Sequence, residues 1–150
     1  MTGRGAPGTG RPGIGRLATA GLAVLGVINL LQGGWAWFAP RHFYDTFPGF
    51  GQRWTATYPP YNAHLITDLG ATFIAFGVLL TLAALLRDRR VTVVVLVGVL
   101  VFSVLHLVFH MLHRDVEGGL PPASLVALVL GVLAPGVLLV LARRAGRRPA

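Results

Sequence analysis

The sequence contains no cysteine and no lysine, and only five of its 150 residues are acidic. The lack of cysteine excludes disulfides, catalytic thiolates and cysteine-ligated zinc or iron–sulfur centres. Charged residues make up 12% of the chain, which is about half of the roughly 25% that is typical of soluble domains. Hydrophobic residues reach 54%. The composition therefore argues against an ordinary soluble domain and indicates a membrane protein.

The apolar residues are gathered in four blocks, and each block is long enough to cross a hydrocarbon core of about 30 Å. The sequence predicts an all-α fold, a four-transmembrane-helix up-down bundle that forms a single membrane domain over residues 14–142. The predicted helices cover residues 14–39, 61–86, 91–113 and 122–142. Residues 1–13 are rich in Gly, Pro and Arg and predict a disordered cytoplasmic tail. Residues 143–150 predict a basic cytoplasmic tail, and Asn62 is the predicted N-cap of the second helix.

All 13 basic residues are arginines, and they are distributed unevenly along the chain. Ten of them lie before the first block, in the short connection 87–90, or after the last block. The positive-inside rule then predicts cytoplasmic N and C termini and an outward-facing linker after the first helix. We therefore predict a multi-pass protein of the cell inner (plasma) membrane. The net charge of +8 is explained by topology and by contact with anionic membrane lipids rather than by nucleic acid.

Histidines and one aspartate occupy the ends of two predicted spans. In the stretch "HLVFHMLH", His106, His110 and His113 are spaced by four and three residues, so they share one helix face. His64 and Asp68 are four residues apart at the start of the second helix. The predicted topology puts both groups in the outer half of the bilayer, with His113 at the rim. A carboxylate at mid-bilayer costs about 2.5–3.5 kcal/mol on insertion scales, which favours facing a partner over facing lipid.

Two histidines and a carboxylate are a common ligand set for zinc or non-haem iron. The sequence therefore predicts a divalent metal between facing helices. The predicted ligands are His64, Asp68, His106 and His110. Haem ranks below a simple metal ion, because Asp68 would lie one turn from a ligand, close to the apolar macrocycle.

Four further polar residues are predicted to orient the ligands or to contact a substrate. Asn29 and Gln32 lie on one face of the first helix, and His42 and Asp45 lie in the linker that follows it. The linker has a simpler interpretation as a loop at headgroup level, anchored by its aromatic residues.

The predicted metal site would act on a lipid-like or quinone substrate by hydrolytic or redox chemistry. Two other readings stay open. In one, the protein is a non-enzymatic accessory or transport protein whose His/Asp cluster binds protons or a polar ligand. In the other, the cluster is a structural hydrogen-bond lock between helices. The sequence decides neither whether the protein is an enzyme nor whether it forms a homo-oligomer.

The stretches "FYDTFPGFGQRW", "PYNAHLITDLGA" and "HLVFHMLH" resemble motifs of an uncharacterised family of small actinobacterial-type membrane proteins. From about Arg16 to Arg144 the architecture is distantly similar to that of the DoxX-like families. This resemblance implies a four-helix membrane fold and, as in some DoxX-like members, redox or quinone chemistry. No catalytic residue of those families is matched to a position of this sequence.

Overall fold

The computed structural model describes residues 14–114 and 121–145. In these two ranges the chain forms five α-helices and one short 3-10 helix. They are α1 (Arg16–Phe38), α2 (Pro40–Thr46), η1 (Thr55–Thr57), α3 (Ala63–Leu86), α4 (Arg89–Leu112) and α5 (Pro122–Ala145). Of these, α1, α3, α4 and α5 are long and apolar enough to cross a membrane. The predicted all-helical class is confirmed for the described residues, with four helices long and apolar enough to span a membrane. The predicted tails at 1–13 and 146–150 lie outside the described residues.

The ends of the long helices follow from capping. The side chain of Asn62 accepts a hydrogen bond from the Leu65 amide at 3.1 Å, so the predicted cap of α3 is confirmed. Asp88 caps α4 in the same way, accepting from the amides of Arg90 and Val91 at 2.8 and 3.1 Å. This cap starts α4 at residue 89 rather than at the predicted 91. The helix α5 ends at Ala145, so it includes the first three residues of the predicted tail 143–150. Its last turn contains Arg143 and Arg144, and positive charges stabilise a helix C-terminus.

The linker between α1 and α3 contains two short helices that the sequence did not predict. Pro40 is the first residue of α2, a position where its missing amide proton costs no hydrogen bond. One side of α2 is buried against the ends of α1 and α3. The residues that form this core, hereafter the linker cluster, are Ala36, Phe43, Tyr44 and Ile66. Their burial explains why a segment too polar to span the bilayer still folds.

Glycines let α1 and α3 pack closely over much of their length. Gly26 and Gly33 on α1, and Gly70 and Gly77 on α3, are each spaced by seven residues and are all buried. A Cβ atom added at Gly33 would lie 2.6 Å from the backbone nitrogen of Ile74. Small residues at such positions are what allows two membrane helices to approach backbone to backbone.

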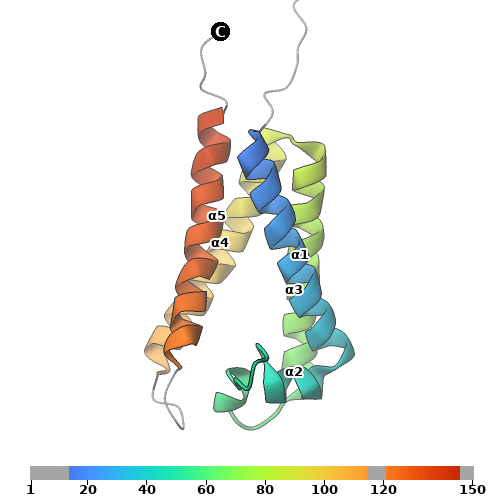
Figure 1. Ribbon diagram of the computed structural model, residues 1–150, viewed down its shortest axis with the longest axis vertical. Coiled ribbons are helices and arrows are strands. Elements are labelled where there is room, and N and C mark those ends of the chain that lie inside the picture. The colour runs from blue at the N-terminus through green and yellow to red at the C-terminus, as the bar shows by residue number, and fades with distance from the viewer. Residues whose placement is uncertain (1–13, 115–120, 146–150) are drawn as a thin grey trace, which may run out of the picture.

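The four long helices share one core only near the chain termini, at the end of the molecule where α1 begins and α5 ends (Figure 1). Members of this core include Leu22, Leu80, Leu96, Leu138 and Ala142. Toward the opposite end, where the linker lies, the pair α4–α5 diverges from the pair α1–α3 (Figure 1). Contacts within each pair are accordingly more extensive than contacts between the pairs.

Large aromatic rings, rather than glycines, join the two helix pairs near their middle. Phe102 of α4 contacts Phe73 and Phe76 of α3, with ring centroids 6.1 and 5.2 Å apart. Helices held apart by such side chains cannot approach as α1 and α3 do. The fold therefore consists of two helix pairs. They pack together at the end where α1 begins and α5 ends, and they are separated at the end where the linker lies.

Candidate functional site

One face of α4 changes from apolar to polar along its length. Its residues are spaced by four and three alternately, so they lie in one row on the helix. The row is Thr92, Leu96, Val99, Ser103, His106 and His110. The first three are buried in the shared core, whereas the last three are half-buried. Thr92 satisfies its hydroxyl on the backbone oxygen of Asp88. The half-buried polar residues of the row therefore begin where the two helix pairs diverge.

His106 and His110 form the centre of this polar stretch. Their ring centroids are 4.6 Å apart and their planes nearly perpendicular, at 87°. His106 is also stacked on Phe102 at 5.5 Å and 14°. Within the described residues His106 makes ring contacts but no hydrogen bond. A neutral imidazole carries one donor and one acceptor, so both are left for another molecule.

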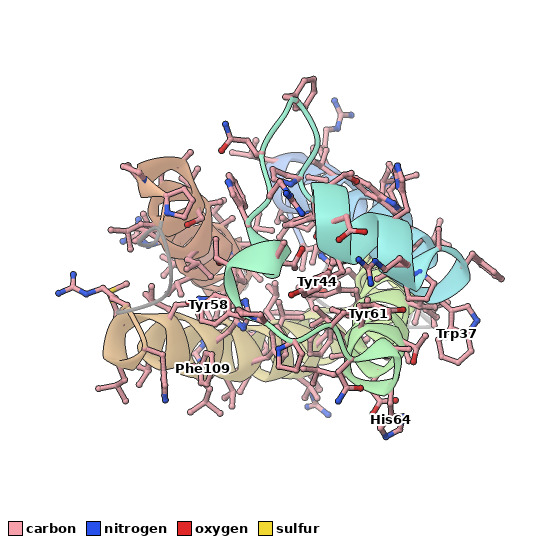
Figure 2. All side chains as sticks on the ribbon, turned by 90° about the horizontal axis from the view of Figure 1, so that it is seen from below. Trp37, Tyr44, Tyr58, Tyr61, His64 and Phe109 are labelled. Atoms are coloured by element: carbon pink, nitrogen blue, oxygen red, sulfur yellow. The ribbon has the colours of Figure 1, made fainter. Side chains whose placement is uncertain are left out.

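Tyr58 reaches this site from the linker. Its hydroxyl lies 2.8 Å from Nδ1 of His110 and 3.4 Å from the backbone oxygen of His113. Figure 2 shows Tyr58 lying over α4 near Phe109, whose ring it contacts at 6.2 Å. The linker is thus joined to α4 directly through a side-chain hydrogen bond. The sequence did not single out Tyr58, because a tyrosine in an interfacial loop has no feature that distinguishes a histidine partner from lipid.

We expect the link between Tyr58 and α4 to weaken above pH 10. Burial raises the pKa of Tyr58 above its usual value of 10.0, so the folded protein holds this proton more tightly than the unfolded chain. The contribution to stability is complete below pH 10 and is lost as the pH rises through the folded pKa. Thermal unfolding of the wild type at pH 8 and pH 10.5 measures the loss.

The control for this pH effect is Tyr58→Phe. At pH 8 this variant should be less stable by about 0.5–1.5 kcal/mol, the net value of one hydrogen bond. Its stability should also fall less than that of the wild type between the two pH values. An identical fall in both proteins would contradict the assignment of the alkaline transition to Tyr58.

The pair His64–Asp68 lies elsewhere. Nε2 of His64 and Oδ2 of Asp68 are 3.3 Å apart, and the side chains are 86% and 62% exposed. Figure 2 shows His64 pointing away from the bundle. Because α3 turns Ile66 and Gly70 toward α1, residues 64 and 68 fall on a different side of the helix.

The four predicted metal ligands consequently form two separate pairs, one on α3 and one on α4. Among the residues that the structure describes, no three His, Asp or Glu side chains gather closely enough to hold a metal ion. The geometry therefore gives the zinc or iron site no support, and the metal stays a prediction.

The predicted helper residues of α1 make no hydrogen bond to either pair within the described ranges. The side-chain amide of Asn29 donates to the backbone oxygen of Leu25 in the same helix, at 2.9 Å. Gln32 is half-buried and makes no hydrogen bond in the described part of the chain. It lies one turn from Trp35, at the end of α1 nearest the linker. Neither residue orients the histidines in the predicted way.

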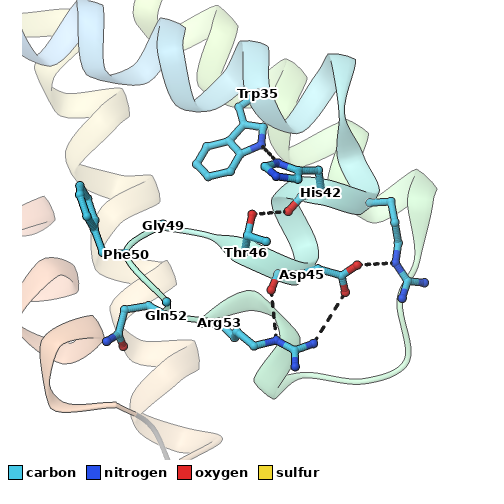
Figure 3. A pocket seen from close by; sticks show the side chains of 10 residues that line it. Trp35, His42, Asp45, Thr46, Gly49, Phe50, Gln52 and Arg53 are labelled. Atoms are coloured by element: carbon cyan, nitrogen blue, oxygen red, sulfur yellow. Dashed lines mark hydrogen bonds and ion pairs between the residues drawn. The ribbon is translucent and has the colours of Figure 1, made fainter.

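His42 and Asp45 line a hollow of about 690 Å³ beside α2 (Figure 3). Nδ1 of His42 accepts a hydrogen bond from the indole nitrogen of Trp35 at 2.9 Å. Asp45 accepts from Nε of Arg41 at 2.7 Å, and this hydrogen bond and the carboxylate charge raise the pKa of Arg41. The hollow and the His106–His110 pair share no residue, so the two are distinct sites.

Comparisons with known proteins do not indicate a function for this chain. No family model matches the chain, and no match was found among curated proteins or solved structures. The DoxX-like resemblance therefore stays a prediction, and any function must be argued from the chain itself.

Proposed function

We propose that this protein is a multi-pass protein of the inner (plasma) membrane that binds the polar group of a lipid-like or quinone ligand at His106 and His110. The termini are cytoplasmic and the linker faces outward, since ten of the 13 arginines flank the termini and the 87–90 connection. The four long helices alternate in direction across the bilayer. The ligand site then lies in the outer half of the membrane.

The observation that carries this proposal is the unpaired imidazole of His106. It is half-buried on a membrane-spanning helix and has no hydrogen-bond partner among the described residues. A polar group without a partner in an apolar environment costs free energy, which a ligand carbonyl or hydroxyl removes by hydrogen bonding. His110, held by Tyr58 at 2.8 Å, supplies a second and oriented imidazole.

The surroundings of the pair favour a flat, amphiphilic ligand. Rings of Phe102 and Phe109 contact the two imidazoles at 5.5 and 5.6 Å, so they offer apolar surfaces beside the polar atoms. The contacts of α4 with α3 and with α5 are each less extensive than those of α1 with α3. A ligand enters from the bilayer with its tail remaining in lipid.

Binding is favoured over hydrolysis as the role of the site. In the described part of the chain neither His106 nor His110 forms an ion pair with a carboxylate, and Asp68 pairs with His64 instead. A general base for hydrolysis is usually oriented by such a third group. The proposed role is therefore recognition of a polar-headed ligand by an accessory or carrier protein.

The test is binding of a decyl-substituted benzoquinone to the protein in an uncharged detergent. A ligand present at 100 times its Kd stabilises a protein by about 2.7 kcal/mol, which is readily seen in thermal unfolding. We expect His106→Leu to lower the affinity about tenfold, because a hydrogen bond worth about 1.4 kcal/mol is lost. The matched control is His113→Gln, which changes an exposed histidine on the same helix end.

Equal quinone affinity in wild type and His106→Leu would overturn the proposal. Zinc should be tested in the same assay to separate the two classes of ligand. Stabilisation by zinc that is lost in both Asp68→Asn and His106→Leu would support the four-ligand metal site instead. Stabilisation by quinone alone, lost only with His106, supports the site on α4.

A further inference from the structure

The hollow beside α2 is bordered by two arginines that share one carboxylate (Figure 3). Asp45 accepts from Nε of Arg41 at 2.7 Å and lies 3.9 Å from Nη2 of Arg53. Nε of Arg53 donates to the backbone oxygen of Asp45 at 3.1 Å. The terminal nitrogens of both guanidinium groups make no hydrogen bond to any described residue. Both side chains are about two-thirds exposed, at 67% and 68%.

Two other side chains of the hollow, those of His42 and Gln52, accept hydrogen bonds from tryptophans. The indole of Trp35 is a donor only, so Nδ1 of His42 accepts and a neutral His42 carries its proton on Nε2. The indole of Trp54 donates to Oε1 of Gln52 at 3.2 Å, which leaves the amide hydrogens of Gln52 unused. The two tryptophans thus leave N–H groups as the unused polar atoms of His42 and Gln52, which both line the hollow.

The net charge of the hollow is positive, so both its charge and its N–H donors favour an anion. Two guanidinium cations and the carboxylate of Asp45 leave a net charge of +1 at this place, before His42 is counted. A space of about 690 Å³ falls in the size range of small-ligand sites, which is about 300–1,000 Å³. A small anion with several acceptor oxygens therefore satisfies both the charge and the hydrogen bonds.

Exposed aromatic residues place the hollow at the membrane surface. Phe50, at the tip of the loop that borders the hollow, is fully exposed at 101%, and it adopts a left-handed conformation with φ of 56°, which bulky residues rarely do. Phe38, at the end of α1, is exposed as well. Aromatic side chains at the ends of spanning helices are typical of the headgroup region.

We propose that this hollow is a site for a phosphate or phosphodiester anion, bound by Arg41 and Arg53 with His42 and Gln52 as additional donors. The planar guanidinium group matches the geometry of phosphate oxygens and can bind two of them at once. The anion is either the headgroup of an acidic phospholipid or free phosphate. This proposal uses none of the residues of the quinone site and stands independently of it.

The experiment titrates three probes into the protein in an uncharged maltoside detergent. They are dioctanoyl phosphatidylglycerol, dioctanoyl phosphatidylcholine and inorganic phosphate. Binding is followed by tryptophan fluorescence, to which Trp35 in the wall of the hollow contributes. We expect phosphatidylglycerol to bind and Arg53→Gln to weaken this binding about tenfold, with a larger loss in the double variant Arg41→Gln, Arg53→Gln. Added salt should weaken binding in the wild type.

The matched control is Arg114→Gln, which removes an exposed arginine outside the hollow. This variant should bind like the wild type. Arg53→Gln leaves the Arg41–Asp45 pair in place, so resistance of the linker to limited proteolysis equal to that of the wild type verifies that the linker is folded. Competition by phosphate at similar concentration identifies a free-anion site, and its failure identifies the lipid headgroup. Wild-type affinity in the double variant, or equal affinity for phosphatidylcholine, overturns the proposal.

Discussion

Replacing Gly70 with alanine should strongly destabilise the protein. A Cβ atom at this position would lie 2.8 Å from the backbone nitrogen of Trp37 and 3.0 Å from the backbone oxygen of Gly33. Backbone atoms cannot rotate away as side chains do, so α1 and α3 must move apart. Overpacking usually costs about 1–3 kcal/mol, and we expect the upper end of that range. Thermal or denaturant unfolding in detergent measures it.

The matched control is Gly34→Ala. Gly34 lies in α1 next to Gly33, but a Cβ atom there meets no neighbour within 4 Å. Alanine is favoured over glycine inside a helix by about 0.5–1 kcal/mol, so this variant should be as stable as the wild type or more stable. If both alanine variants unfolded at the same temperature, the close contact between α1 and α3 would be wrong.

The second large effect is expected from Phe43→Ala in the linker. Phe43 is only 1% exposed and is the largest of the fully buried side chains in the described residues. Its ring is stacked on Phe47 at 4.6 Å and meets Trp35 edge-on at 5.4 Å. Truncating a buried phenylalanine costs about 3–5 kcal/mol. Because this core contains no residue of α4 or α5, the linker should unfold while the membrane helices remain.

Limited proteolysis of the linker would detect this local unfolding, and so would the tryptophan emission, because two of the three tryptophans, Trp35 and Trp54, contact Phe47 in the linker. Phe50→Ala is the control, since it removes the same side chain from a fully exposed position in the same segment. A surface substitution of this kind usually changes stability by less than about 0.5 kcal/mol. Equal protease sensitivity of the two variants would mean that the linker cluster does not hold the segment.

Phe43→Ala also tests how strongly each of the two proposed sites depends on a folded linker. The linker carries Tyr58, which holds His110, and it carries both arginines of the hollow. Unfolding the linker should therefore weaken phosphatidylglycerol binding strongly. Quinone binding should weaken less, because His106 itself belongs to α4 and depends on packing against Phe102.

The sequence alone determined the helical class, the number of helices long and apolar enough to span a membrane, and the cap that starts one of them. Length and hydropathy identify membrane helices because a fixed bilayer thickness requires about 20 apolar residues. The cap at Asn62 was predictable because its side chain bonds an amide three residues away. The i,i+4 spacings likewise predicted that His64 shares a helix face with Asp68 and that His106 shares one with His110, and the members of each pair are in contact. All of these are local properties of the chain.

Only the tertiary structure decided which of these local groups face one another. Spacing puts two residues on one face of a helix but says nothing about how that helix is rotated against its neighbours. The rotation of α3 is set by Gly70 and Gly77, which must face α1 for the backbones to approach, and it carries His64 and Asp68 away from the bundle. Tyr58 meets His110 through the fold of the linker, which the linker cluster packs against α1 and α3. Long-range packing, rather than local spacing, therefore separated the predicted metal ligands and assembled the two sites proposed here.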